Sequence, residues 1–180
     1  MTEKKELERI ITLINAGFHG GAWHGSSVLE VTKGIKNKAA EYRQKNVHTI
    51  AELIYHITSW RIFAVKKING DEDYNIKTEN QNWGSLGTID EFELETLIME
   101  LTLSQDELIK ALEEKDDNFL ELIVPGAEYN YYTLLHGIIH HDLYHTGQMA
   151  ILKKMAPVKK KDDDYDGKSS YFSSDYEDEY

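Results

Sequence analysis

Residues 49–70 read TIAELIYHITSWRIFAVKKING, and this stretch decides the fold class. It opens with a capping box of Thr49 and Glu52, in which the hydroxyl and the carboxylate each satisfy a backbone amide at the start of a helix. Apolar residues then recur every three or four positions, which is the period of an amphipathic helix with one buried face. This stripe comprises Leu53, Ile57, Trp60 and Ala64. The stretch therefore predicts one long helix that ends at Asn69 and Gly70.

Three other segments of the chain show the same helical period. The first ends before Gly20, where a glycine pair stops the pattern. The second opens with a capping box of Thr88 and Glu91 and fades into a charged run. The third starts after Asn130 and ends before Pro157. Four long helices indicate an all-α protein built as a four-helix bundle.

Length and composition indicate one folded unit followed by a tail. The chain has 180 residues, of which 41% are hydrophobic, enough for one buried core. We expect the bundle to occupy residues 1–158, with short extra helices within 25–43 and connections at 71–87 and 118–130. Residues 159–180 are rich in Asp, Ser and Tyr, which favours a solvated acidic tail, although its aromatic residues could anchor it as a functional arm.

Charge and cysteine content exclude several classes of function. The chain carries 20 basic and 32 acidic residues, and a net charge of -12 repels nucleic acids and phospholipid surfaces. No run approaches the roughly 18 apolar residues of a membrane span. Cysteine is absent, so disulfides, iron-sulfur clusters and cysteine nucleophiles are excluded. We expect a cytoplasmic protein in which any metal is held by His, Asp or Glu.

Four of the eight histidines lie close together in the last predicted helix: His136, His140, His141 and His145. The last two are one helical turn apart, so both imidazoles can approach one ion from the same face. They also lie on the stripe that should face the core. His136 and His140 lie off the stripe, and we expect surface or structural roles for them.

A third histidine, His56, lies on the buried stripe of residues 49–70. Together with His141 and His145 it would complete a site of three imidazoles, which leaves coordination positions open as in catalytic metal centres. The alternative is that all three are hydrogen-bonded core histidines, and spacing alone does not decide between these interpretations. However, two neutral histidines one turn apart in an apolar interior would need separate acceptors, whereas a shared cation removes that need.

Two other metal motifs fit less well. His141-Asp142-Leu-Tyr-His145 is similar to the His-Glu-x-x-His of zinc proteases, but that class uses glutamate as base and takes its third ligand downstream, where no histidine follows. A di-iron bundle needs Glu-x-x-His on two helices, and the sequence contains none.

Three motifs in this chain are shared with a known family: WHG at 23–25, HTIAELIYHITSWR at 48–61 and LLHGIIHHDLYHTGQ at 134–148. Together they resemble the DinB family, also called YfiT-like metal-dependent hydrolases, over about residues 6 to 154. The resemblance implies a four-helix bundle of the DinB/YfiT-like type that forms a homodimer. It also implies one divalent transition metal, zinc or nickel, held by the same three ligands, His56, His141 and His145.

The activity implied by this resemblance is broader. Members include thiol transferases that use low-molecular-weight thiols, a thiol-dependent isomerase and proteins without an assigned substrate. The resemblance thus implies a metal-dependent hydrolase or thiol S-transferase acting on a small molecule, with a thiol as a candidate cosubstrate. The alternative is a non-enzymatic metal-binding module for stress response or dimerisation.

Several residues are candidates for the surroundings of the ion: Glu52, Gln148, His24, Trp23 and Tyr144. Metal-bound histidines normally donate their second nitrogen to an acceptor. Glu52 could accept from His56, but it is also the capping partner of Thr49, and we favour the cap. Gln148 could accept from His145 or pack in the core.

The remaining candidates would line the pocket. Trp23 and His24 either stand at its mouth or pack near the first helix, and the sequence favours neither. Tyr144 and Arg61 could contact an anionic group of the substrate.

Overall fold

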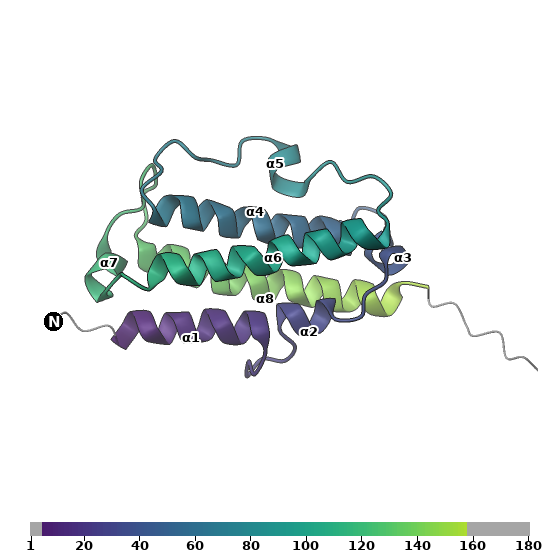
Figure 1. The fold of residues 1–180 in the computed structure, drawn as a ribbon, viewed down its shortest axis with the longest axis horizontal. Helices are drawn as coiled ribbons and strands as arrows, with labels where there is room; N and C mark the ends of the chain where they lie inside the picture. The colour runs from purple at the N-terminus through teal and green to yellow at the C-terminus, as the bar shows by residue number, and fades with distance from the viewer. Residues whose placement is uncertain (1–4, 158–180) are drawn as a thin grey trace, which may run out of the picture.

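The computed structural model describes residues 5–157, and within this range the chain forms helices and no strand. Four helices are long: α1 (Lys5–His19), α4 (Ile50–Ile68), α6 (Glu91–Leu112) and α8 (Tyr131–Met155). They lie side by side (Figure 1). The predicted all-α class is confirmed. The acidic tail at 159–180 lies outside the described residues, so the boundary at 158 and the role of the tail stay predictions.

Four short helices connect the long ones: α2 (Val28–Thr32), α3 (Asn37–Ala40), α5 (Glu79–Trp83) and α7 (Asp117–Glu121). The first two confirm the extra helices predicted within 25–43. The other two fall in segments that we expected to be connections only. Each has one turn and a capping side chain, Thr78 for α5 and Asp116 for α7, and one turn is too short to show a helical period.

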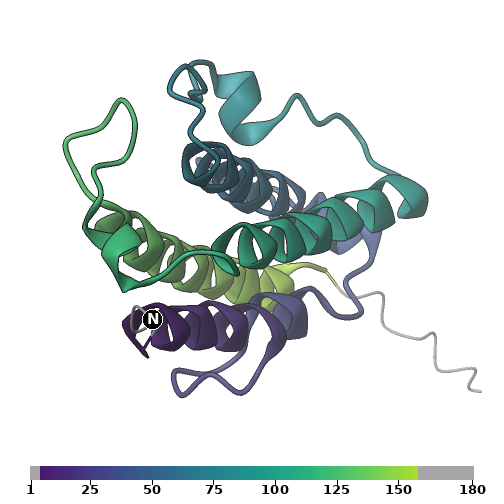
Figure 2. The ribbon, with the colours of Figure 1, turned by 60° about the vertical axis from the view of Figure 1, so that its left-hand side comes forward.

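The α4 helix lies at one side of the four long helices, and α1 lies at the other (Figure 1). The α4 helix packs against both α6 and α8, while α1 packs against α8 on the opposite side from α4 (Figures 1 and 2). The connection from α4 to α6 carries α5, which packs on α4. A bilayer crossing would require a longer apolar helix than any in the described part of the chain.

The core consists of two apolar clusters. One joins the end of α1 and the helix α2 to the first halves of α4 and α6 and the end of α8, and the other joins the remaining parts of the four long helices with α7. Between them lie three buried polar side chains, Arg61, Gln105 and Asp142, which we call the polar layer. On α8 His141 and His145 flank Asp142, so the candidate site adjoins this layer.

The start of α6 differs from the prediction. Its N-cap is Asp90, not Thr88, and the capping box pairs Asp90 with Glu93. The reason is burial, because this start places Ile89 immediately before the cap, where it packs in the same apolar cluster as Leu94. Such a contact between the residue before the cap and the fourth helical residue is a hydrophobic staple. The predicted cap Thr49 is confirmed, as is the predicted start of the last helix after Asn130, which is its N-cap.

Candidate metal centre

The structure brings His56, His141 and His145 together, one from α4 and two from α8. One ring nitrogen of each lies within 4.8 Å of the other two. The Nε2 atoms of His56 and His141 are 3.0 Å apart. Two ligands of a tetrahedral zinc ion, each at ~2.0–2.1 Å, are themselves ~3.3 Å apart, so the spacing fits a single ion. His140 is exposed, and His136 packs against the ring of Tyr132 away from the three.

Hydrogen bonds orient two of the three rings. The Nδ1 of His56 lies 3.0 Å from the carbonyl oxygen of Asn82, and the Nδ1 of His145 lies 2.8 Å from Oε1 of Gln148. Because both partners are acceptors, each Nδ1 carries the proton and each Nε2 keeps its lone pair. His141 Nδ1 is buried without a hydrogen-bond partner in residues 5–157. The Nε2 atoms are therefore the ligand atoms that the cluster offers.

Burial keeps the three imidazoles neutral. It lowers the pKa of His56 to about 4 and that of His141 to about 3, and it also lowers the pKa of His145. Charge on the neighbouring histidines, and for His141 the nearby Arg61, contributes to these lowered pKa values, whereas the hydrogen bond with Asn82 opposes the lowering of the His56 pKa. At neutral pH, protons therefore do not compete for the Nε2 lone pairs, and the donor set fits a divalent transition metal.

The short helix α5 covers His56. The indole of Trp83 lies flat between two imidazoles, 3.8 Å from the ring centre of His56 and 3.6 Å from that of His48. The side-chain oxygen of Asn82 accepts a hydrogen bond from Trp60 Nε1 at 3.1 Å. We did not predict Asn82 or Trp83. The capping pair of Thr78 and Gln81 could have revealed the helix, but not that it folds back onto α4.

Glu52 serves the cap, as favoured from the sequence. Its carboxylate accepts from the Thr49 amide at 2.9 Å and also binds Arg43 and His48. It therefore supports His48, which lies on the far face of Trp83, and not His56. The hydrogen-bond acceptor for His56 is therefore the backbone carbonyl of Asn82 and not a carboxylate.

Two cavities flank the cluster. The first, of about 380 Å³, is lined by residues from the segment before α4, from α4, α5 and α8: Asn46, Val47, His48, Leu53, His56, Trp83, Tyr144, His145 and Gln148. The second, of about 260 Å³, lies between α4 and α8 and is lined by Trp60, Tyr129, Thr133, Leu134, Gly137, Ile138 and His141. Tyr144 and Gln148 thus line a cavity beside the three histidines. Trp23 and His24 are exposed and line neither cavity.

Arg61 does not face a substrate. Its side chain is fully buried, where the guanidinium pairs with Asp142, binds Gln105 and lies 4.5 Å from the ring centre of Phe18. The expected contact with an anionic substrate is wrong, because the helical stripe of α4 carries this residue into the polar layer. Burial raises the pKa of Asp142 to about 6, and the charge of Arg61 opposes this rise. Asp142 therefore has a partner in the core and does not stand as a general base.

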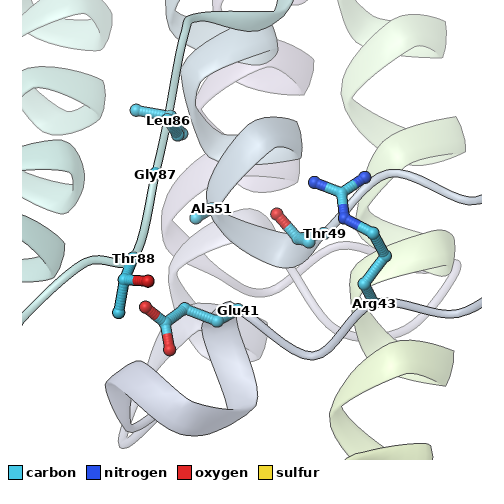
Figure 3. A pocket seen from close by; sticks show the side chains of 7 residues that line it. All are labelled: Glu41, Arg43, Thr49, Ala51, Leu86, Gly87 and Thr88. Atoms are coloured by element: carbon cyan, nitrogen blue, oxygen red, sulfur yellow. The ribbon is translucent and has the colours of Figure 1, made fainter.

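A further cavity of about 380 Å³ lies away from the histidines, where α3, the start of α4 and the connection leading to α6 meet (Figure 3). Two charged side chains line it, Glu41 and Arg43. Glu41 accepts the amide of Ile89, and Arg43 pairs with Glu52. Both hold local structure, so we assign no chemistry to this cavity.

One comparison with known proteins finds a match. The family model of the DinB superfamily matches residues 22–149, a range that contains all three clustered histidines. No curated protein and no solved structure matches the chain.

Proposed function

The chain belongs to the DinB superfamily, and on that premise we propose that it is a metal-dependent enzyme acting on a small molecule at His56, His141 and His145. One observation carries the proposal: three neutral imidazoles from two helices direct ring nitrogens to a common point between two cavities. Zinc and nickel are the proposed ions, since both accept imidazole ligands.

The residues around the cluster support catalysis over metal binding alone. Three protein ligands leave a coordination position open for water or substrate. Asn82 and Gln148 orient two of the rings, and Trp83 excludes water from one face of His56. A divalent ion held there would supply Lewis acidity, which lowers the pKa of water or of a thiol. Hydrolysis and thiol transfer, with a low-molecular-weight thiol as cosubstrate, are the proposed reactions.

The alternative is a non-enzymatic metal-binding module for stress response or dimerisation. Such a module would favour a closed set of four ligands. In the part of the chain that the structure describes, the histidine group has three members, which favours the enzyme. A homodimer remains part of the proposal because the sequence resemblance implies it, and a cytoplasmic location because cysteine is absent.

Elemental analysis of purified, untagged protein tests the site. We expect about one zinc or nickel ion per chain, and its loss in His141→Ala, because two imidazoles bind a divalent ion far more weakly than three. His140→Ala is the matched control, since His140 is adjacent but exposed. If the wild type and the His140→Ala control both hold no metal after incubation with zinc and nickel, the metal-centre proposal is wrong.

Turnover tests the enzyme class separately. A panel of low-molecular-weight thiols with an electrophilic acceptor, run beside ester and amide substrates, should reveal an activity that chelation abolishes. Metal binding without any metal-dependent turnover across both panels would instead favour the non-enzymatic module.

A further inference from the structure

The cavity between α4 and α8 has an almost wholly apolar lining, whereas the cavity on the other side of the cluster is lined by polar side chains such as His48 and Gln148 as well as by apolar ones. No Asp, Glu, Lys or Arg within the described residues lines it, and its walls are mainly Trp60, Leu134 and Ile138. The hydroxyl of Thr133 already bonds to Asn130 at 2.9 Å. A charged group would lose part of its hydration here without gaining a partner of opposite charge, whereas an apolar group would gain from burial.

The cavity adjoins the candidate metal centre. His141 belongs both to the cavity wall and to the histidine cluster. The indole of Trp60, on the facing wall, lies 6.1 Å from the ring centre of His141 and 6.3 Å from that of His56. A molecule whose reacting end lies at the three imidazoles can therefore extend its next group along α8 into this cavity.

Gly137 keeps part of this space open. It lies in the interior of α8, where a glycine weakens the helix relative to alanine, and a Cβ built on it meets no atom within 4 Å. Gly147 lies further along α8. A Cβ built on it also meets no atom within 4 Å, but Gly147 does not line the cavity. The volume of about 260 Å³ suffices for an aromatic ring or a short alkyl chain, since an apolar cavity of ~150 Å³ already binds benzene.

We propose that this cavity is a subsite for an uncharged aromatic or aliphatic group of the substrate, and that Gly137 determines which groups enter. The inference rests on the proposed function and deepens it, because it assigns a substrate class to the same centre. The substrates would be molecules with a metal-reactive polar end and an adjoining apolar group. The other cavity, lined by Tyr144 and Gln148 among others, remains available for a cosubstrate.

Binding of hydroxamates to the zinc-loaded full chain tests the subsite without requiring turnover. Acetohydroxamate carries only the metal-binding end, and benzohydroxamate adds a phenyl ring. By calorimetry we expect benzohydroxamate to bind at least about 10-fold tighter to the wild type. Adding a charge to the ring, as in 4-carboxybenzohydroxamate, should abolish most of that advantage, because the carboxylate would be desolvated.

Filling the cavity should remove the preference. In Gly137→Leu we expect the ratio between the two hydroxamates to fall to within about 2-fold, with unchanged zinc content and unchanged affinity for acetohydroxamate. Gly137→Ala, which fills less space, should give an intermediate ratio and serves if the leucine variant folds poorly. Gly147→Leu, the matched control, should keep the wild-type ratio.

The outcomes separate the two proposals. If zinc and acetohydroxamate bind but the ratio is near one, or if Gly137→Leu leaves the ratio unchanged, the subsite is wrong while the metal centre stands. Undiminished binding of the carboxylated ring would also overturn it. If zinc itself does not bind, the proposed function fails and the subsite fails with it.

Discussion

At the scale of single residues, the hydrogen bond made by one ring nitrogen decides what the other nitrogen can do. The proton on His145 Nδ1 is held by Gln148 and that on His56 Nδ1 by the carbonyl of Asn82. The Nδ1 of His141 has no such partner in the described range. The geometry of the cluster thus depends on one side-chain amide and one backbone carbonyl.

Gln148→Ala should weaken metal binding by about 10- to 100-fold, the usual effect of removing the acceptor behind a ligating histidine. The variant leaves all three ligands in place, so the stoichiometry at saturating metal should stay at that of the wild type. Competition against a chromophoric chelator measures the affinity. An unchanged affinity would show that Gln148 only packs beside His145.

The buried ion pair in the polar layer makes a second residue-scale prediction. Asp142→Ala leaves the guanidinium of Arg61 buried without its charge partner, and the loss of stability should be about 3–5 kcal/mol. The double variant Arg61→Met with Asp142→Leu removes both charges and should be much closer to the wild type. Urea denaturation in the presence of a chelator measures both without a contribution from metal. Equal losses in the single and double variants would contradict this account.

At the scale of elements, helix starts are set by which residue becomes buried next to the cap. Residues 88–93, TIDEFE, contain two overlapping capping boxes, Thr88 with Glu91 and Asp90 with Glu93. The protein uses the second, because only this choice places Ile89 beside Leu94 in the core. The amide of Ile89 is satisfied by Glu41 at the same time.

The cap of α6 can be tested directly. Asp90→Ala should destabilise the protein by about 1 kcal/mol, because the Glu93 amide loses its acceptor. Thr88→Ala should change the free energy of unfolding by less than about 0.5 kcal/mol, since Thr88 is exposed and outside the cap. Thermal denaturation of the two variants in parallel measures both losses of stability. A larger loss in Thr88→Ala than in Asp90→Ala would mean that Thr88 is the N-cap of α6.

At the scale of the whole molecule, polar groups interrupt an otherwise apolar interior. The two apolar clusters stabilise the fold, while the polar layer and the histidines form a buried region that must satisfy charges and lone pairs. This region makes the stability of the metal-free protein depend on pH. The sign follows from which state of the chain binds more protons.

Without metal, the protein should lose stability as the pH falls from about 6.5 toward 4. Below its ordinary value near 6.5, each clustered histidine binds a proton in the unfolded chain, whereas the folded pKa of His56 is about 4 and that of His141 about 3. Each additional proton bound by the unfolded chain costs ~1.4 kcal/mol per pH unit. Asp142, whose pKa is raised to about 6, acts oppositely below that pH and offsets one such proton.

Urea denaturation at pH 7.5 and 5.5 in the presence of a chelator measures this dependence. His141→Gln should show a smaller loss on acidification than the wild type, because it has one histidine fewer to protonate on unfolding. His140→Gln, changed at an exposed position, should lose as much as the wild type. Identical losses in all three proteins would mean that the cluster does not control stability at low pH.

The sequence by itself determined the helical class, the four long helices and the pairing of His141 with His145. These follow from the period of the α-helix, which is a local property and places residues four apart on one face. The apolar stripe also led to His56, because a histidine among buried residues must face the same interior as the others. The DinB resemblance predicted the same three residues.

Only the tertiary structure decided which partners complete the site. Asn82 and Trp83 reach His56 because the connection after α4 folds back over that helix, and no local period encodes where a connection returns. Arg61 is buried because Asp142 and Gln105 meet it from α8 and α6, a compensation invisible in any single stretch. Local spacing determines the face on which a side chain lies, whereas its burial and partners depend on chain segments distant in sequence.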